Sequence, residues 1–250
     1  MIHPDYPYLY ETHLHTSQSS ACAHNTGYEM AKAAHEYGYA GIIVTDHNWG
    51  GNTAVDRSLP WKEWVRRFAE GYLDAKRYAD AHPDFDVFFG YEAGFHGTEF
   101  LIYGISPEWM AEHPEIRGDS MEEHLRRVRA AGGTVVHAHP FREEWYIPEI
   151  RLLPELVDGV EGINATHSNT KSTSHHDASC DRRAVAYANE HALPMSAGSD
   201  IHSTDLFGGG VALRRRLQGI DDYCRMLRGH EDHLLTNGDT WFDARGQMLK

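Results

Sequence analysis

Hydrophobic and polar residues follow two alternating patterns along this 250-residue chain. Short apolar runs, typical of strands buried on both faces, are separated by stretches with apolar residues at three- and four-residue spacing, typical of amphipathic helices. The predicted strands are 8–15, 40–45, 86–92, 99–104, 134–140, 159–164, 193–199 and a short one near 234–235. The predicted helices are 26–37, 60–82, 120–131, 150–156, 179–191 and 220–228. This alternation predicts an α/β fold with a mostly parallel sheet, in one domain.

Polar residues of the types that bind metals follow six of the predicted strands. In order, they are His13 and His15, Asp46 and His47, Glu92, His137 and His139, His167, and Asp200 and His202. The carboxyl ends of parallel strands meet at one edge of a sheet, so these side chains are expected to converge. Imidazoles and carboxylates without thiolates suit Zn, Mn or Fe, and more than four ligands imply more than one ion.

Composition narrows the possible partners and the compartment. The formal net charge of −14 disfavours binding to extended duplex nucleic acid. Because no apolar run is long enough to span a membrane and the amino terminus lacks signal-peptide features, we expect no membrane contact and a cytoplasmic location. The three cysteines, Cys22, Cys180 and Cys224, are widely spaced, which predicts ordinary thiols rather than a disulfide framework or a thiolate zinc site.

The ordered motifs H-x-H, T-D-H, G-x-E, H-P and G-S-D-x-H, which span residues 13–202, resemble the signature of a known superfamily. This is the PHP (polymerase and histidinol phosphatase) superfamily of metal-dependent phosphoesterases. The resemblance implies a distorted (β/α)7 TIM-like barrel filling residues 1–250, with two or three divalent ions (Zn, Mn or Fe) at the strand carboxyl ends. It also implies that a metal-activated hydroxide hydrolyses a small phosphomonoester, a nucleotide or a short oligonucleotide.

The resemblance further implies roles for individual residues. The ligand set would place one ion on His13, His15 and Asp200, a second on Glu92 and His139 with Glu92 as the bridge, and a third on His47 and His202. Glu92, Asp200 and His202 are also expected to act in catalysis.

The chain departs from the family pattern at two places. Glu99 stands where many relatives have a histidine, so it is either a carboxylate ligand or a solvent-facing residue. In the loop after H-x-H, relatives often have an aspartate or a histidine that binds a third ion. Here the corresponding residues, 19–22, are Ser-Ser-Ala-Cys, so neither residue type is present. His24, two residues further along the loop, is an alternative ligand for the third ion.

Three residues are candidates for binding the substrate. Arg142 resembles the arginine of an H-P-x-R element and would bind phosphate as a charged fork, unless it pairs with Glu143 or Glu144. His167 and Lys171 belong to a loop expected on the same face.

Two other functions are compatible with parts of the pattern. An amidohydrolase-like metallohydrolase acting on C–N bonds also begins with H-x-H, but it usually has a metal-bridging lysine, and none of the five lysines ends a predicted strand. The other alternative is a non-catalytic, metal-binding regulatory module.

Overall fold

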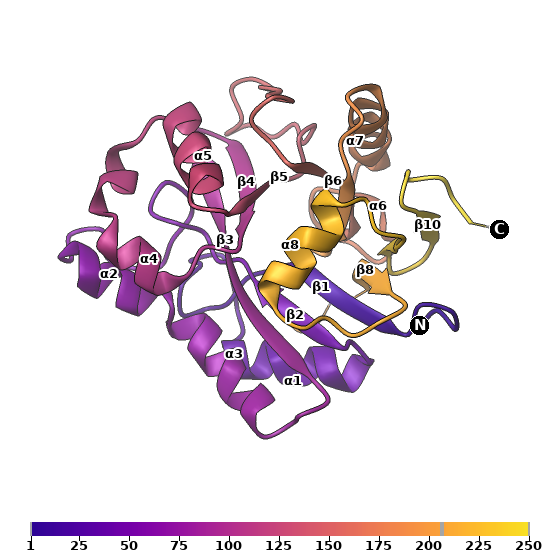
Figure 1. Cartoon of the computed structure of the whole chain (residues 1–250), viewed down its shortest axis with the longest axis horizontal. Coiled ribbons are helices and arrows are strands. Elements are labelled where there is room, and N and C mark those ends of the chain that lie inside the picture. Colours follow the sequence, from indigo (N-terminus) through magenta and orange to yellow (C-terminus); the bar gives the residue numbers. More distant parts are fainter. Residues whose placement is uncertain (1, 206–207, 250) are drawn as a thin grey trace.

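The computed structural model describes residues 2–205 and 208–249, and it contains one curled ten-stranded sheet in the order β10-β9-β8-β1-β2-β3-β4-β5-β6-β7 (Figure 1). The strands are β1 (Tyr8–Leu14), β2 (Gly41–Val44), β3 (Asp86–Phe95), β4 (Thr98–Tyr103), β5 (Thr134–His137), β6 (Gly159–Asn164), β7 (Met195–Gly198), β8 (Gly209–Leu213), β9 (Leu234–Asn237) and β10 (Trp241–Asp243). The helices are α1 (Gly27–Tyr37), α2 (Trp61–Phe68), α3 (Glu70–Asp80), α4 (Pro107–Glu112), the 3-10 helix η1 (Pro114–Gly118), α5 (Met121–Ala130), α6 (Ala165–Ser168), α7 (Ala178–Glu190) and α8 (Ile220–Arg228).

The α/β class is confirmed, but the prediction of a mostly parallel sheet is wrong. Four of the nine strand pairs are parallel and five are antiparallel. The antiparallel pairs arise because β4 returns directly from β3, and because β8, β9 and β10 run back and forth at one side of the sheet. A tight turn needs far fewer residues than the helical crossover that joins parallel strands.

The sheet curls so that the chain after β7 reaches β1. Leu14 and Ile201 form a parallel bridge, with hydrogen bonds from His15 N to Ile201 O (3.0 Å) and from Ile201 N to His13 O (3.3 Å). The Thr12 hydroxyl adds a bond to Ala197 O at 2.7 Å. The first and seventh strands of the chain are therefore joined at their carboxyl ends.

Helices cover the outer face of the curled sheet (Figure 1). Helices α1 and α3 pack beside each other, and Gly27 lies so close to Gly71 that a Cβ on Gly27 would come within 2.0 Å of the Gly71 carbonyl oxygen. Helix α1 begins at the capping box formed by Thr26 and Glu29 and ends at left-handed Gly38, as residues of these types predict.

Two predicted helices differ from the structure. The segment 60–82 forms α2 and α3, which meet at Ala69. At this junction the Ser19 hydroxyl bonds to the Phe68 carbonyl at 2.7 Å, and a side chain inserted at the backbone in this way interrupts a helix. Residues 150–156 form turns and irregular chain, because Pro154 supplies no amide hydrogen for a helix interior.

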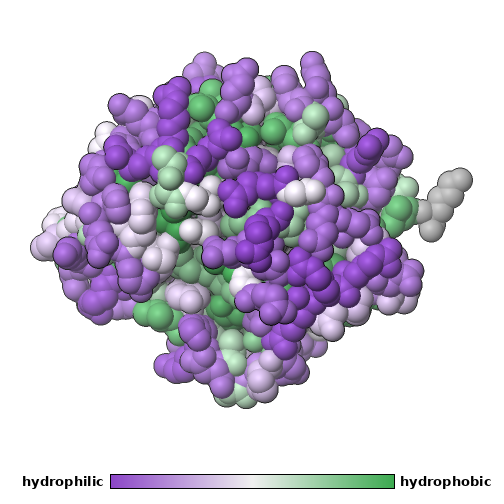
Figure 2. Space-filling model, viewed as in Figure 1, coloured by the Kyte–Doolittle hydropathy of each residue, from purple (hydrophilic) through white to green (hydrophobic). Residues whose placement is uncertain are grey.

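Several short elements have no counterpart in the sequence pattern, namely β8, β10, α4, α6 and η1. The face of the molecule in Figure 2 is largely hydrophilic, with hydrophobic side chains in small groups. Within the described residues, every helix is too short or too polar to traverse a lipid bilayer.

Candidate metal centre

Eight side chains of the types that bind metals form four overlapping groups near the carboxyl ends of the parallel strands and on the hairpin of β3 and β4. Within each group the potential ligand atoms lie within 4.8 Å of one another. The groups are His13, His15 and Asp200; His13, Glu92 and His139; His47, Glu92 and Glu99; and His15, His47 and His202. Since His13, His15, His47 and Glu92 each belong to two groups, the four groups form one continuous cluster.

The bridge between β1 and the chain after β7 explains how the first group forms. His13 and His15 flank Leu14, and alternate residues of an extended chain point to one side. Asp200 flanks Ile201, the partner of Leu14. As a result, Asp200 Oδ1 lies 3.4 Å from His13 Nε2 and 3.3 Å from His15 Nε2.

The hairpin of β3 and β4 supplies the two glutamates. Glu92 pairs with Leu101 and Gly94 with Glu99, so Glu92 and Glu99 are diagonal neighbours on one face. His47 follows β2 and bridges to Glu92, which places its Nδ1 2.7 Å from Glu92 Oε2.

His139 and Asp200 share an uncommon backbone conformation, with φ angles of 28° and 54°. Non-glycine residues seldom adopt positive φ, and such strain persists where the surroundings fix it, often at functional sites. The turn at His139 directs its Nε2 to within 3.0 Å of Glu92 Oε1.

The electrostatics of the glutamates require positive charge. Burial alone would raise the pKa of the Glu92 carboxyl, but the imidazoles of His47 and His13 outweigh it and hold the pKa well below its usual value. Burial and the charge of Glu92 raise the pKa of Glu99 to about 8. A cation bound between the two carboxylates would allow both to ionise.

The two histidines of the H-x-H motif have pKa values shifted in opposite directions. For His13, burial lowers the pKa, but the carboxylates of Asp200 and Glu161 outweigh it and raise the pKa well above the usual value. For His15, burial and the nearby imidazoles of His47 and His202 lower the pKa well below the usual value. A neutral His15 keeps a lone pair for a metal.

Unpaired buried atoms show that the cluster fits metal ions. Nε2 of His13, Nε2 of His15, Nδ1 of His47 and Oε2 of Glu92 are buried and make no well-oriented hydrogen bond. Their nearest polar neighbours are one another and Asp200, with His47 Nδ1 2.7 Å from Glu92 Oε2 and Asp200 Oδ1 3.4 Å and 3.3 Å from Nε2 of His13 and His15. Leaving buried polar atoms unpaired is costly, and coordination to a divalent cation would satisfy all four. The donor set of imidazoles and carboxylates matches zinc, manganese or iron.

Glu161, on β6, contacts His13 and His139 on the side away from the cavity, although no sequence motif includes it. Its Oε1 lies 2.9 Å from His13 Nδ1, and its Oε2 accepts bonds from His139 N and Asn164 Nδ2, each at 3.0 Å. A carboxylate on Nδ1 leaves Nε2 of the same imidazole free for a metal. The sequence did contain one signal for Glu161, because it is a charged residue within an otherwise apolar strand. A charge buried in this way needs polar partners.

Arg142 lies in the cluster, buried rather than paired with Glu143 or Glu144. Its guanidinium bonds to Asp200 Oδ2 at 2.6 Å and to His167 Nε2 at 3.1 Å. The other ring nitrogen of His167 lies 2.9 Å from Asp181 Oδ1.

A cavity of about 540 Å³ opens over the cluster, and its lining includes Arg142, Trp145, Tyr146 and His175. Among the described residues, no lysine lines this cavity. Lys171 is exposed on a turn outside it, and His167 lies beneath Arg142 rather than in the lining.

Three other residues near the cluster, His24, His137 and Cys22, belong to none of the four groups. His24 is exposed, and only its backbone N–H reaches the cluster region, with a bond to His202 O at 2.8 Å. His137 is buried with its ring stacked on Phe100, outside the four groups. Cys22 lines the cavity, and its contacts with His202 and His47 outweigh burial and lower the pKa of its thiol to about 6.

Comparisons with known proteins agree with this geometry. No protein-family model and no curated protein sequence matches the chain. A two-domain protein from Bacteroides vulgatus, containing a predicted PHP-like metal-dependent phosphoesterase, aligns over 94% of the chain with a TM-score of 0.64 and 14% identity. The chain spans 66% of the length of that protein.

A proposed metal-dependent phosphoesterase from Bifidobacterium adolescentis aligns over 87% of the chain and 94% of its own length, with a TM-score of 0.51 and 16% identity. An amidohydrolase from Chromobacterium violaceum, with bound sulfate and no metal, aligns over 78% and 87% of the two chains at 18% identity, but its TM-score of 0.49 supports no conclusion. The first two similarities show that the chain has the fold of PHP-like metal-dependent phosphoesterases.

Proposed function

We propose that this chain is a metal-dependent phosphoesterase that hydrolyses a small phosphomonoester, a nucleotide or a short oligonucleotide. The observation that carries the proposal is the continuous cluster of eight ligand side chains beneath one cavity. In this proposal residues 1–250 form a single PHP-type domain, and the curled sheet is a distorted (β/α)7 barrel. The similarity of fold supports the class of chemistry.

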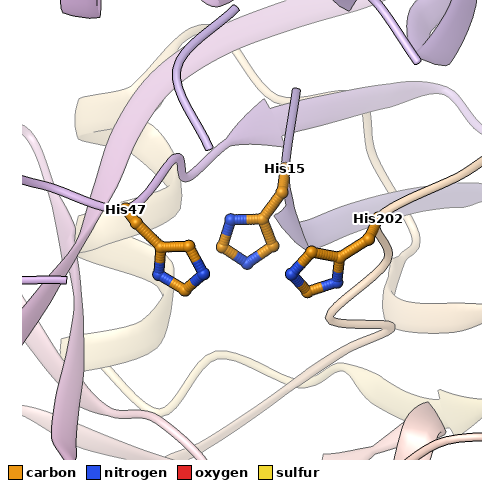
Figure 3. A group of neighbouring side chains, drawn as sticks. All are labelled: His15, His47 and His202. Carbon is orange, nitrogen blue, oxygen red and sulfur yellow. The ribbon is translucent and has the colours of Figure 1, made fainter. Parts of the chain in front are cut away.

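The overlapping groups support an assignment of ligands to two or three ions. His13, His15 and Asp200 would hold the first ion, and Glu92 would bridge it to a second ion on His139 and Glu99. A third ion would be held by His47 and His202, whose rings lie on either side of the His15 ring (Figure 3).

Divalent ions held here would supply positive charge for the phosphoryl oxygens and an acidified water as the nucleophile. The chain's own residues bind and orient the substrate. Arg142 is held by Asp200 and His167, so its guanidinium is fixed at the cavity wall, where it would bind a phosphate oxygen. His167 therefore acts on the substrate through Arg142, whereas Lys171 is too exposed to be held at the cavity.

The absence of a lysine from the described cavity lining disfavours the amidohydrolase-like alternative, which usually uses a bridging lysine. Phosphoester chemistry also accounts for Arg142, because a planar fork of N–H donors matches a phosphate group. A non-catalytic module would have no need for an open cavity over its ligands.

The test is a hydrolysis screen with chelator-treated protein reconstituted with Mn, Zn or Fe. Substrates would include p-nitrophenyl phosphate, its bis-ester, histidinol phosphate, nucleoside monophosphates, short oligonucleotides and an amide control. We expect metal-dependent release of phosphate or nucleotide, lost in Asp200→Asn and retained in Glu190→Gln, a change on the exposed end of α7. No turnover with any metal and phosphoester would overturn the proposal, and turnover of the amide alone would favour the alternative.

A further inference from the structure

A second cavity, of about 410 Å³, adjoins the cavity over the metal cluster. The two cavities share three lining residues, Asn52, Glu99 and Tyr146. Glu99 also belongs to the metal cluster. A group in the second cavity can therefore be part of the same molecule as a phosphate that is held over the metal cluster.

Aromatic rings form much of the wall of this second cavity. They come from the loop after β2, the end of the β3–β4 hairpin and the loop after β5, and they belong to Trp49, Phe95, His96 and Tyr146. Aromatic side chains bind planar rings, including nucleobases, by stacking, and this contact tolerates different bases because each has a π face. The second cavity is therefore suited to a planar ring.

Packing fixes Trp49 before any ligand binds. Its ring makes edge-to-face contacts with Trp61, Trp64 and His124, at centroid distances of 5.1, 5.7 and 5.7 Å. Arg57 Nε donates a hydrogen bond to the Trp49 carbonyl oxygen at 2.8 Å. Because these contacts already restrict the ring, a ligand that stacks on it loses little affinity to the ordering of the side chain.

The loop that carries Trp49 is tied to the β3–β4 hairpin. Asn48 Oδ1 accepts hydrogen bonds from Gly50 N at 3.0 Å and from Gly94 N at 3.2 Å. The two segments lie so close that a Cβ on Gly50 would come within 2.2 Å of the Gly94 carbonyl oxygen. The positions of Trp49 and of Phe95, the residue after Gly94, are therefore fixed relative to each other by the fold.

The boundary between the two cavities is suited to a sugar. Asn52 offers an amide and Tyr146 a hydroxyl, and both groups can form hydrogen bonds with sugar hydroxyls. A ring esterified directly to the phosphate would stay over the metal cluster. A ring joined to the phosphate through a sugar would instead reach past Glu99 into the second cavity.

We propose that the second cavity binds the base of a nucleotide whose phosphate lies over the metal cluster and whose sugar crosses the boundary at Asn52, Glu99 and Tyr146. The inference rests on the phosphoesterase function proposed above and narrows its substrates to phosphoesters that contain a nucleotide unit. Trp49 is the residue that distinguishes these substrates from sugar phosphates without a base.

Two substrates with the same phosphoester test this subsite in the wild-type chain. Adenosine 5′-monophosphate and ribose 5-phosphate carry the phosphate at the same sugar position, but only the first has a base. With metal-reconstituted protein we expect kcat/KM to be about 10–100-fold higher for the nucleotide, the range that stacking of one base on an aromatic side chain gives. Equal values, or turnover of another phosphoester without turnover of the nucleotide, would overturn the subsite.

A variant locates the effect on Trp49. Trp49→Leu removes the ring and keeps an apolar side chain against Trp61 and Trp64. We expect the ratio of kcat/KM for the nucleotide to kcat/KM for the sugar phosphate to fall about tenfold. Trp109→Leu makes the same change on α4, at a residue that is not among the described residues lining either cavity, and should keep the wild-type ratio. A wild-type ratio in Trp49→Leu would contradict the role of Trp49.

Binding of adenosine separates this inference from the proposed function, because the nucleoside has no phosphate to hydrolyse. Saturation-transfer difference NMR detects weak binding, and with zinc-loaded wild-type protein we expect transfer to the base protons of adenosine and its loss in Trp49→Leu. Transfer in a protein that hydrolyses no phosphoester would overturn the proposed function and support the base subsite. Hydrolysis of phosphoesters without transfer to the base protons would overturn the subsite alone.

Discussion

Glu161 offers a sharp test, because its two carboxylate oxygens accept bonds from three donors around the metal cluster. Oε1 faces His13 Nδ1, and Oε2 accepts from His139 N and Asn164 Nδ2. Glutamine has almost the same shape as glutamate but only one acceptor oxygen. The substitution Glu161→Gln therefore changes the hydrogen bonding with little change in packing.

The cost of this change depends on whether metal is bound. A metal on His13 Nε2 requires the proton on Nδ1, so the amide that Glu161→Gln introduces must leave at least one buried donor facing its own NH2 group. One unpaired buried donor costs about 1–3 kcal/mol, which corresponds to a loss of metal affinity between about fivefold and 150-fold. Without metal, the raised pKa of the wild-type His13 keeps protons on both ring nitrogens, but Glu161→Gln removes one of the carboxylates that raise it. His13 can then lose the Nδ1 proton and accept a bond from the NH2 group of the new amide, whose oxygen still accepts from His139 N and Asn164 Nδ2.

The assay is a competitive titration of Zn²⁺ against a chromogenic chelator, together with the melting temperature in the presence of EDTA. We expect Glu161→Gln to bind the His13 ion about 10–100-fold more weakly, with a smaller drop in melting temperature in EDTA than with bound zinc. Glu190→Gln makes the same chemical change at an exposed position and should leave both values unchanged. Zinc affinity within twofold of the wild type in Glu161→Gln would refute the role of Glu161 in fixing His13.

The remaining predictions concern stability. Gly198→Ala places a Cβ 2.4 Å from the Cβ of His13, so chemical denaturation should show a loss of about 1–3 kcal/mol, whereas Gly118→Ala, whose Cβ meets nothing within 4 Å, should change little. Burial raises the pKa of the Glu11 carboxyl from 4.5 to about 7, so between these pH values the folded state holds a proton that the unfolded state loses. The free energy of unfolding of the metal-free protein should therefore fall by up to roughly 3 kcal/mol as the pH rises from 4.5 to 7. Glu11→Gln should flatten that slope in denaturant titrations, and an unchanged slope would contradict this cause. A divalent ion at 100 times its dissociation constant should raise the melting temperature by about 5–10 °C in differential scanning calorimetry, and no shift with Zn, Mn or Fe would argue against binding.

The sequence predicted most elements near the site because their signals are local. The short apolar runs before His47 and Glu92 are typical of buried strands, and Thr26 is a residue type that favours the start of a helix. The split of the predicted helix 60–82 was not predictable, since it depends on a bond from Ser19, which lies about 50 residues earlier. The order of the strands likewise depends on pairing between distant segments.

In the candidate site, too, residues in local motifs were predictable and residues that depend on distant contacts were not. The H-x-H pair and the histidine before Pro140 were visible because each motif lies on one strand end. Glu161 was not, because its importance comes from contacts with residues near the ends of other strands. Arg142 was found as a candidate, but its bond to Asp200 required the folded chain.

The most direct test of the central claim is the number of divalent ions bound per chain. Protein treated with a chelator, reloaded separately with Zn, Mn or Fe and freed of excess metal would be analysed by inductively coupled plasma mass spectrometry against protein concentration. The cluster of His13, His15, His47, Glu92, Glu99, His139, Asp200 and His202 predicts two or three ions per chain with at least one of these metals. One ion or none with all three metals would contradict a polynuclear centre.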